Sequence, residues 1–216
     1  MTVAALYDVH ANAPALAAVL ADGAADADAV VFGGDLVAGA WPRETLELAR
    51  SLGDRAHFVR GNWERYVAER RDHAAVAWLL ERVEPDELDW PSSLLLDGVL
   101  YVHATPQRDD AIVLPPWRDD DWEPFTAPFT VCGHSHIQYD VARDGRRIVN
   151  PGSVGNPTVR PAAWWALIDG DDVELRTTDY DTDATAAAMG ETGWDWLGFV
   201  DELRNPYSLE QIRETL

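Results

Sequence analysis

Five short groups of polar residues carry side chains of the kind that bind metal ions. In chain order they are Asp8-Val9-His10, Gly34-Asp35, Gly61-Asn62, His103 and Gly133-His134-Ser135-His136. Carboxylates, imidazoles and an amide oxygen together suit Mn²⁺, Fe²⁺, Fe³⁺, Zn²⁺ or Ni²⁺. The chain has a single cysteine, Cys132, so it lacks the paired thiolates that hold structural zinc. The residue types therefore predict a transition-metal site that is built from oxygen and nitrogen ligands.

The elements around these groups predict that the side chains meet at one place. Three short apolar runs, which lead into the first three groups, cover residues 3–7, 30–32 and 57–59. Between these runs, helices are predicted over 13–21, with Asn12 as the N-cap, and over 43–52. Strands that alternate with helices form parallel sheets, and the chemistry of such sheets occurs at the carboxyl ends of the strands. We therefore expect Asp8, Asp35 and Asn62 at one edge of a parallel sheet.

The rest of the chain changes from helical to strand patterns. A long helix is predicted over 63–83, and a tail of two or three short helical pieces over 181–216. Between them, strands are predicted over 94–96, 99–102, 129–132, 137–141, 147–149, 163–168 and 173–177, with Asp-Gly pairs at three of the turns. Residues 106–128 form an insertion without clear periodicity. The chain 1–216 is predicted to be one domain, whose second half is a mostly β layer packed on the first sheet.

The composition limits the expected partners and compartment. The net charge is −21, and all 17 basic residues are arginine. An acidic surface without a basic run repels duplex nucleic acid and anionic membranes, so neither is an expected partner. No apolar run approaches the length of a membrane helix, the start lacks the basic segment of a signal peptide, and one cysteine gives no intrachain disulfide. We therefore expect a cytoplasmic protein, and the sequence leaves a homo-oligomer open.

Each group on its own has a simpler structural explanation. Asp8 could be a turn residue, Asp35 could lie in a turn after two glycines, and His103 could be a hydrogen-bonded core histidine. His134 and His136 are harder to explain in this way, because two imidazoles beside a glycine favour a ligand role. Five groups in order, each after a strand, occur by chance far less often than any one of them. The metal interpretation is therefore preferred for the set.

As a set, the groups resemble the signature D-x-H … G-D … G-N … H … G-H-x-H of the calcineurin-like metallophosphoesterases. The segment Asn150-Pro151-Gly152-Ser153-Val154-Gly155 is similar to the N-P-G-S-V-G segment of the small bacterial and archaeal single-domain branch of that superfamily. The resemblance extends from about Thr2 to about Asp179. It implies an α/β fold in the form of a four-layer α-β-β-α sandwich, in which two mixed sheets pack together. A dinuclear metal site is then expected at the carboxyl ends of the strands.

The resemblance also implies which residues hold two metal ions. The first ion would be bound by Asp8, His10, Asp35 and His136, and the second by Asp35 as a bridge, Asn62, His103 and His134. Two divalent ions about 3.5–4 Å apart clamp a phosphate and lower the pKa of a bridging water, whose hydroxide attacks phosphorus. Mn²⁺ is the first expectation for the metal, with Fe, Zn or Ni as alternatives. The residues expected to carry the catalysis are Asp8, Asp35, Asn62 and His134.

Three positions depart from the family pattern. Family members that hydrolyse demanding phosphoesters usually have G-N-H-D or G-N-H-E where this chain has Gly61-Asn62-Trp63-Glu64, although members of the small branch often lack that histidine too. The family commonly has S-D-x-H-G-N where this chain has Tyr7-Asp8-Val9-His10-Ala11-Asn12, which is a mild change. The family histidine resembles a general acid, whereas an indole N–H is only a hydrogen-bond donor and cannot protonate a leaving alkoxide. We therefore expect activity mainly toward esters with good leaving groups. Candidate substrate contacts are Asn12, Trp63 and Arg160, although core packing for Trp63 and a solvated ion pair for Arg160 are simpler roles.

Three functions compete on this basis. The preferred function is a metal-dependent phosphoesterase that acts on a small phosphodiester, with phosphomonoesters second. The alternative is a non-catalytic metal-binding scaffold, because the same fold serves that way in the eukaryotic retromer subunit and a fold does not fix a function. The third is a nuclease like those of the family's repair branch, and the net charge of −21 argues against it.

Overall fold

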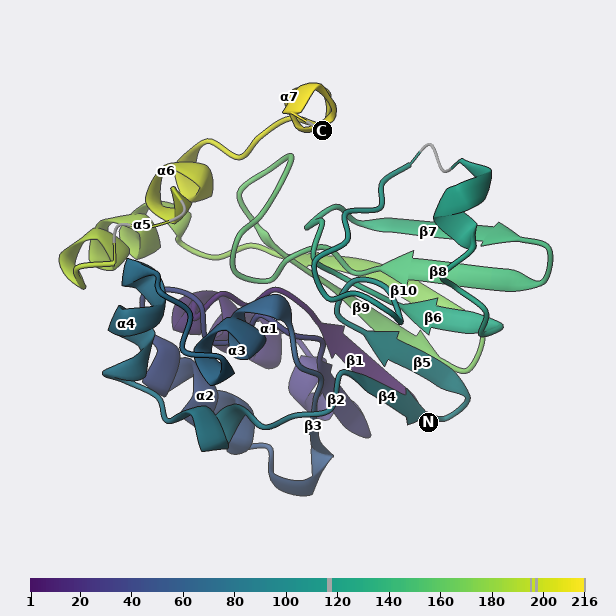
Figure 1. The fold of residues 1–216 in the computed structure, drawn as a ribbon, viewed down its shortest axis with the longest axis horizontal. Coiled ribbons are helices and arrows are strands. Elements are labelled where there is room, and N and C mark those ends of the chain that lie inside the picture. The colour runs from purple at the N-terminus through teal and green to yellow at the C-terminus, as the bar shows by residue number, and fades with distance from the viewer. Residues whose placement is uncertain (116–117, 195, 197, 216) are drawn as a thin grey trace.

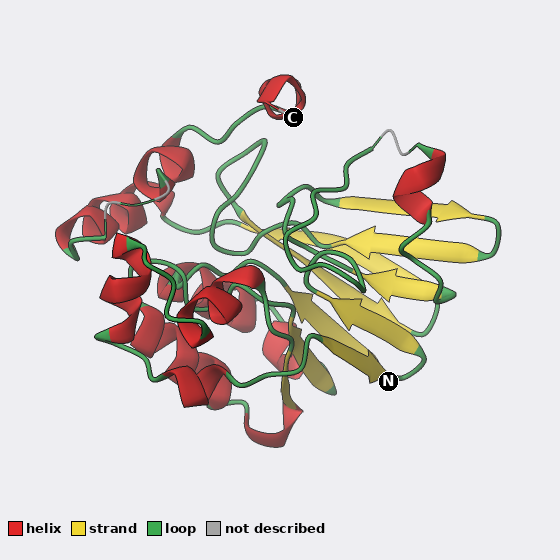
Figure 2. Ribbon diagram, viewed as in Figure 1, coloured by secondary structure: helices red, strands yellow, loops and turns green. Residues whose placement is uncertain are grey.

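The structure is a computed structural model, and it describes residues 1–115, 118–194, 196 and 198–215. Two five-stranded sheets pack against each other, and helices cover the outer face of the first sheet (Figures 1 and 2). The first sheet has the order β10-β9-β1-β2-β3, with β1 Thr2–Leu6, β2 Ala29–Phe32, β3 Ala56–Phe58, β9 Ala163–Asp169 and β10 Asp172–Thr178. The second has the order β4-β5-β6-β8-β7, with β4 Ser93–Leu96, β5 Val99–Val102, β6 Phe129–Val131, β7 Tyr139–Arg143 and β8 Arg146–Asn150.

The helices lie in three parts of the chain, namely the first half, the insertion and the tail. Those of the first half are α1 Ala13–Ala21, α2 Pro42–Arg50, α3 Asn62–Ala68 and α4 Ala74–Leu80, with the short 3₁₀ helices η1 Ala24–Asp26, η2 Gly53–Arg55 and η3 Pro85–Leu88. The insertion contains η4 Asp119–Trp122. The tail forms α5 Thr182–Glu191, α6 Phe199–Arg204 and α7 Leu209–Thr215, which confirms the predicted short helical pieces. Among the described helices, none combines the length and the apolar composition that a membrane span needs.

The parallel β-α-β-α-β unit predicted for the first third of the chain is confirmed. Strands β1 and β2 pair in parallel, with Leu6 opposite Phe32, and β2 pairs in parallel with β3. The crossovers are α1 and α2. Asn12 caps α1, since its side-chain oxygen accepts a hydrogen bond from the N–H of Ala15 at 3.1 Å. The loops after β1, β2 and β3 therefore open at the same edge of the sheet.

The last two strands do not belong to the second sheet, so the prediction of a separate β layer in the second half is wrong for them. Strand β9 pairs antiparallel with β1, with Ala166 opposite Ala5, and β10 pairs with β9 at the edge of the first sheet. Both faces of β9 are apolar. Trp165 contacts the helix-side core and Ile168 contacts the core between the sheets. A strand buried on both faces is stable inside a covered sheet, where β9 lies.

The long helix predicted over 63–83 is interrupted in the structure. The interruption separates α3 from α4, and it includes Arg70, whose φ of 49° is left-handed. His73 starts the second helix, because its Nδ1 accepts a hydrogen bond from the N–H of Ala75 at 3.1 Å. The residues between the two helices are charged and exposed, so this turn has no apolar face to bury.

The two faces of β1 explain how the sheets and helices pack. Ala4 and Leu6 point to the core under the helices, and Val3, Ala5 and Tyr7 point to the core between the sheets. This alternation follows from the two-residue period of a strand. The apolar run before Asp8 is therefore buried in both cores, and this burial holds Asp8 in place at the end of β1.

Tyr7, which replaces the serine of the family pattern, connects the sheets. Its hydroxyl donates to the carbonyl oxygen of Val131 on β6 at 3.0 Å. A Cβ atom at Gly33 would lie 2.0 Å from the Tyr7 ring, and one at Gly133 would lie 2.4 Å from it. The ring thus fills the space that two glycines leave, and the departure at this position is a matter of packing.

The insertion 106–128 covers the outer face of the second sheet, and its positions 116–117 lie outside the described residues. Trp122 and Phe125 are buried and form a third core with Ile148 of β8. The described part of the insertion contains one short 3₁₀ helix, η4. The helical layer on the outer face of the second sheet is therefore thin.

Glu87 on η3 holds two arginines of α2, and this cluster gives a prediction for stability. Glu87 accepts hydrogen bonds from Arg43 at 2.7 Å and from Arg50 at 2.8 Å. The bond from Arg43 lowers the pKa of Glu87 from 4.5 to about 2. We expect Glu87→Gln to lower the free energy of unfolding at pH 7 by about 1–2 kcal/mol, after allowance for solvent screening. Because the folded pKa is the lower one, this contribution is present above about pH 4.5 and is lost as the pH falls toward about 2.

Urea unfolding of the wild type and the variant at pH 7 and pH 3 measures this difference. Glu81→Gln is the matched control, because Glu81 is 74% exposed and pairs only with Arg82 among the described residues. A difference between Glu87→Gln and wild type that stays constant from pH 7 to pH 3 would contradict the ion-pair explanation.

Candidate metal centre

Polar side chains from the loops after β1, β2, β3, β5 and β6 converge at one edge of the two sheets. Asp8, His10 and His136 form one group, and Asp35, His103 and His134 form another. Within each group, one potential ligand atom of every residue lies within 4.8 Å of the others. Asn62, the first residue of α3, lies beside the second group. The structure thus brings together the residues that the resemblance implied as metal ligands.

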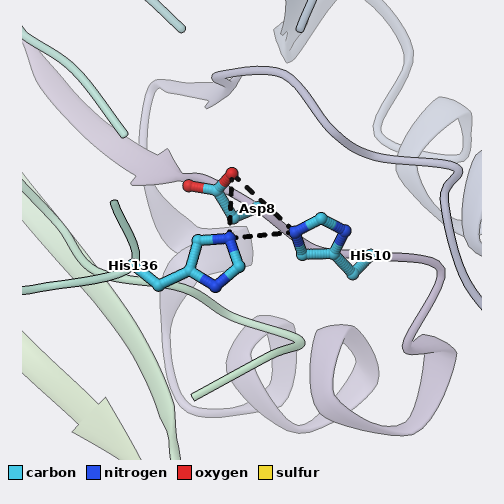
Figure 3. A group of neighbouring side chains, drawn as sticks. All are labelled: Asp8, His10 and His136. Atoms are coloured by element: carbon cyan, nitrogen blue, oxygen red, sulfur yellow. Dashed lines mark hydrogen bonds and ion pairs between the residues drawn. The ribbon is translucent and has the colours of Figure 1, made fainter. Parts of the chain in front are cut away.

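Asp8 is the centre of the first group (Figure 3). Its Oδ1 atom lies 3.5 Å from Nε2 of His136 and 3.9 Å from Nε2 of His10. These two imidazole nitrogens are 3.0 Å apart. The same Oδ1 lies 3.9 Å from Nε2 of His103. Three imidazole nitrogens therefore face one carboxylate oxygen, which connects the first group to the second.

The second group is arranged around His103. Its Nε2 atom lies 3.5 Å from Oδ2 of Asp35 and 3.1 Å from Oδ1 of Asn62. The rings of His103 and His134 are 5.2 Å apart between centroids, and the backbone N–H of His134 donates to Asp8 Oδ2 at 2.8 Å. A carboxylate, an amide oxygen and two imidazoles therefore surround one point.

The histidines are oriented in the way that metal ligands are. Nδ1 of His10 is 3.2 Å from the carbonyl oxygen of Ala38, and Nδ1 of His103 is 2.9 Å from that of Gly33. A proton on Nδ1 that is donated to the carbonyl leaves the lone pair of Nε2 directed into the group. Asp8 Oδ1 is buried and has no hydrogen-bond partner among the described residues, which is costly unless a cation completes its surroundings. The donor set therefore fits divalent transition-metal ions.

Burial and the charges of neighbouring groups both shift the pKa values of the centre. Burial acts to raise the pKa of Asp8, but the imidazoles around it, His136 first, outweigh burial and lower it. Burial and the charge of His136 lower the pKa of His10 to about 4. Burial also acts to lower the pKa of His103, yet the charges of Asp35 and Asp8 outweigh it and raise that pKa to about 10. Ionised carboxylates thus attract positive charge, and metal ions that bind here would displace protons.

Most of the candidate ligands have a left-handed backbone, which the sequence did not indicate. The φ angles are 52° at Asp8, 49° at His10, 51° at Asp35, 65° at His134 and 58° at His136. Such angles cost roughly 1–3 kcal/mol at non-glycine residues and persist where surrounding structure enforces them. One enforcing contact is the His10 N–H, which donates to the Asp35 carbonyl at 2.8 Å. The strand ends turn sharply here, and this turn directs the side chains into the centre.

Glu64 is a buried carboxylate whose role the sequence reasoning missed. Its Oε2 accepts hydrogen bonds from the N–H groups of Gly61 at 2.8 Å and Asp35 at 2.9 Å, and its Oε1 accepts from those of Leu36 at 2.8 Å and Val37 at 3.4 Å. Burial and then the charge of Asp35 raise its pKa to about 7. Glu64 ties the loop after β2 to the start of α3 and so positions Asp35. The available signal was an acidic residue in the first turn of a helix, where side chains accept from free N–H groups.

The segment that resembles N-P-G-S-V-G supports the first group. Ser153 donates to the carbonyl oxygen of Asp8 at 2.7 Å, and the N–H of Gly155 donates to the same oxygen at 3.1 Å. Asn150 donates to the carbonyl oxygen of Gly133 at 3.0 Å. A Cβ atom at Gly155 would lie 1.7 Å from a backbone oxygen of the loop after β1, so only glycine fits there. Residues 150–155 thus hold the backbone of the loops that carry Asp8 and His134.

The three predicted substrate contacts have other partners in the structure. Asn12 is 0% exposed, and besides capping α1 its amide donates to Gly155 and Tyr180, so we revise it to a structural residue. Arg160 is exposed and pairs with Asp179 at 2.6 Å, which is the simpler of its two predicted roles. Trp63 is 9% exposed and belongs to the core under the helices, which is the simpler of its two predicted roles.

Comparison with known proteins identifies relatives over most of the chain. The family model of the calcineurin-like phosphoesterase superfamily domain matches residues 1–172. The crystal structure of a metallophosphoesterase from Sphaerobacter thermophilus is 27% identical with a TM-score of 0.80, and the match covers 94% of this chain and 99% of that one. A hypothetical protein from Pyrococcus horikoshii shares the fold at 19% identity and a TM-score of 0.79, over 94% of this chain and 97% of its own. An uncharacterised protein of Methanocaldococcus jannaschii is 26% identical in an alignment of 215 positions, which covers 83% of this chain and 88% of that protein.

Proposed function

This chain belongs to the calcineurin-like phosphoesterase superfamily, and we propose that it is a dinuclear metal-dependent phosphodiesterase that acts on a small phosphoester. The residues that would hold one ion are Asp8, His10, Asp35 and His136, and those that would hold the other are Asp35, Asn62, His103 and His134. Bound divalent ions, Mn²⁺ in the first instance, would supply positive charge to the phosphate and an activated water. The protein itself would contribute the fixed orientation of these ligands and the exclusion of bulk water from the buried carboxylates.

The observation that supports this proposal most strongly is the orphaned oxygen of Asp8. Oδ1 is buried, is without a hydrogen bond among the described residues, and faces the Nε2 atoms of His10, His103 and His136 at 3.5–3.9 Å. These separations are too long for hydrogen bonds and leave space for an ion between the donors. A site that only stabilised the fold would satisfy this oxygen within the protein.

Two cavities at the centre favour a diester over a monoester. One cavity of about 440 Å³ includes His103 in its wall, and another of about 270 Å³ includes His134 and His136. The second cavity is also lined by Ile112 of the insertion and Tyr207 of the tail. A phosphodiester carries two organic substituents on phosphorus and a monoester carries one. Each cavity could therefore receive one substituent of a diester.

Trp63 supports a preference for esters with good leaving groups. It occupies the position of the family histidine, and its indole N–H can donate a hydrogen bond but is too weak an acid to protonate a leaving oxygen. General acid catalysis contributes about 10²–10⁴-fold where it is present. Without it, the barrier depends on how well the leaving group carries negative charge. A p-nitrophenolate leaving group meets that requirement.

Hydrolysis of bis(p-nitrophenyl) phosphate by chelator-stripped protein tests the proposal. We expect no turnover without metal and restored turnover when Mn²⁺ is added, with two Mn²⁺ bound per chain by calorimetry. Diphenyl phosphate is the comparison substrate, and it should react at least about 100-fold more slowly because its leaving group is more basic. Binding of two Mn²⁺ without turnover of either ester would contradict the enzyme and favour a metal-binding scaffold.

A further inference from the structure

The cavity beside His103 is lined by arginines, two of which are neutralised within the protein. Arg65 forms two parallel hydrogen bonds to Asp109, both of 2.7 Å. Arg108 lies 2.9 Å from Asp110. Since these carboxylates line the same cavity, neither pair leaves an uncompensated positive charge there. The third arginine of the wall, Arg60, is different.

Among the residues that the structure describes, the guanidinium of Arg60 has no partner. The residue is half-buried, its Nε atom is fully buried, and within the described residues its side chain makes neither a hydrogen bond nor an ion pair. At least twelve of the 17 arginines lie within 4.0 Å of a carboxylate oxygen. The chain has a net charge of −21, so carboxylates that could pair with an arginine are in excess. A partly buried guanidinium that is nevertheless unpaired is therefore a candidate binding group for an anionic ligand.

Arg60 is held at a fixed place relative to the metal centre. Its backbone N–H donates to the carbonyl oxygen of Pro91 at 2.8 Å, and the next N–H, that of Gly61, is bound by Glu64. Asn62, two residues further, lies 3.1 Å from Nε2 of His103, which borders the same cavity. A molecule bound at the second ligand group can therefore extend into the cavity that contains the Arg60 side chain.

We propose that Arg60 binds a second phosphate group of the substrate in the cavity beside His103. The inference rests on the proposed function, and it narrows the substrate class to phosphoesters that carry a further phosphate. A planar guanidinium forms paired hydrogen bonds with phosphate oxygens, which makes arginine suited to this group. The volume of about 440 Å³ lies in the range of cavities that hold small molecules of nucleotide size.

A matched pair of esters tests this proposal on the Mn²⁺-loaded full chain. One ester is thymidine 5′-(p-nitrophenyl phosphate), and the other carries an additional phosphate on the 3′ oxygen. We expect kcat/KM to be at least about tenfold higher for the doubly phosphorylated ester, because a charge-assisted hydrogen bond contributes about that factor. Arg60→Gln should abolish this preference. Arg70→Gln, at an exposed arginine that does not line the cavity, should keep it.

Binding of inorganic phosphate to the chelator-stripped protein gives a second measurement that needs no turnover. Calorimetry should show at least about tenfold weaker phosphate binding by Arg60→Gln than by wild type and Arg70→Gln. If wild type shows no preference for the doubly phosphorylated ester, or if Arg60→Gln keeps it, the inference is overturned. If neither ester is hydrolysed, the proposed function fails, and the phosphate affinities alone decide: a loss in Arg60→Gln supports the site, and equal affinities overturn it.

Discussion

Replacing Asp35 with asparagine is expected to lower kcat for bis(p-nitrophenyl) phosphate at least about 10³-fold. Under the proposal, Asp35 is shared by both metal ions, so its charge and its second oxygen are both required. Oδ1 accepts the backbone N–H of Trp63 at 2.9 Å, and Oδ2 lies 3.5 Å from Nε2 of His103. An asparagine can keep the first contact with its amide oxygen. Its NH₂ group then stands where a ligand oxygen is needed, and it cannot bind a cation.

Calorimetric titration with Mn²⁺ should show that Asp35→Asn binds fewer than two ions per chain. Asp179→Asn is the matched control, since Asp179 is 79% exposed, pairs with Arg160 and belongs to neither group of candidate ligands among the described residues. Its activity should stay within about twofold of wild type. Circular dichroism checks that both variants are folded. An Asp35→Asn protein that binds two Mn²⁺ and retains kcat would show that the bridging assignment is incorrect.

The parts of the fold that the sequence predicted are those that local patterns determine. The apolar runs before Asp8 and Asp35, and the capped helix between them, place these carboxylates at the ends of adjacent parallel strands. The spacing of His134 and His136 beside Gly133 indicated ligands in the same way. These features depend on strand period, helix capping and turn preference, which act over a few residues.

The features that the sequence did not predict depend on contacts between distant segments. His136 meets Asp8 across 128 positions of the chain, and β9 joins β1 after the whole second sheet has intervened. The left-handed angles at Asp8 and His134 are imposed by tertiary hydrogen bonds, against the local preference of these residue types. Arg60 and Glu64 are similar, since their importance lies in burial and in what surrounds them. No local pattern distinguishes a paired arginine from an unpaired one.

Replacing Glu64 with glutamine is expected to lower both stability and metal affinity. Four backbone N–H groups donate to its two oxygens, and a glutamine keeps only one acceptor, so the N–H donors of one oxygen would face an NH₂ group. Buried unsatisfied donors cost about 1–3 kcal/mol each, and we expect the free energy of unfolding to fall by about 2–4 kcal/mol. Because Glu64 also positions Asp35, Mn²⁺ affinity should fall about 10–100-fold, as for other residues that orient metal ligands.

Glu69→Gln separates these effects from a general response to losing a carboxylate near α3. Glu69 is 48% exposed, pairs with Arg65 and Arg71, and should change the free energy of unfolding by less than about 0.5 kcal/mol without altering Mn²⁺ binding. Urea unfolding of the metal-free proteins measures the change in the free energy of unfolding alone. Titration with Mn²⁺ measures the change in metal affinity that follows from the position of Asp35. If Glu64→Gln were less stable but bound Mn²⁺ as wild type does, Glu64 would only support the fold. If the free energy of unfolding and the Mn²⁺ affinity both fall, Glu64 is required for metal binding because it positions Asp35, even though it binds no metal itself.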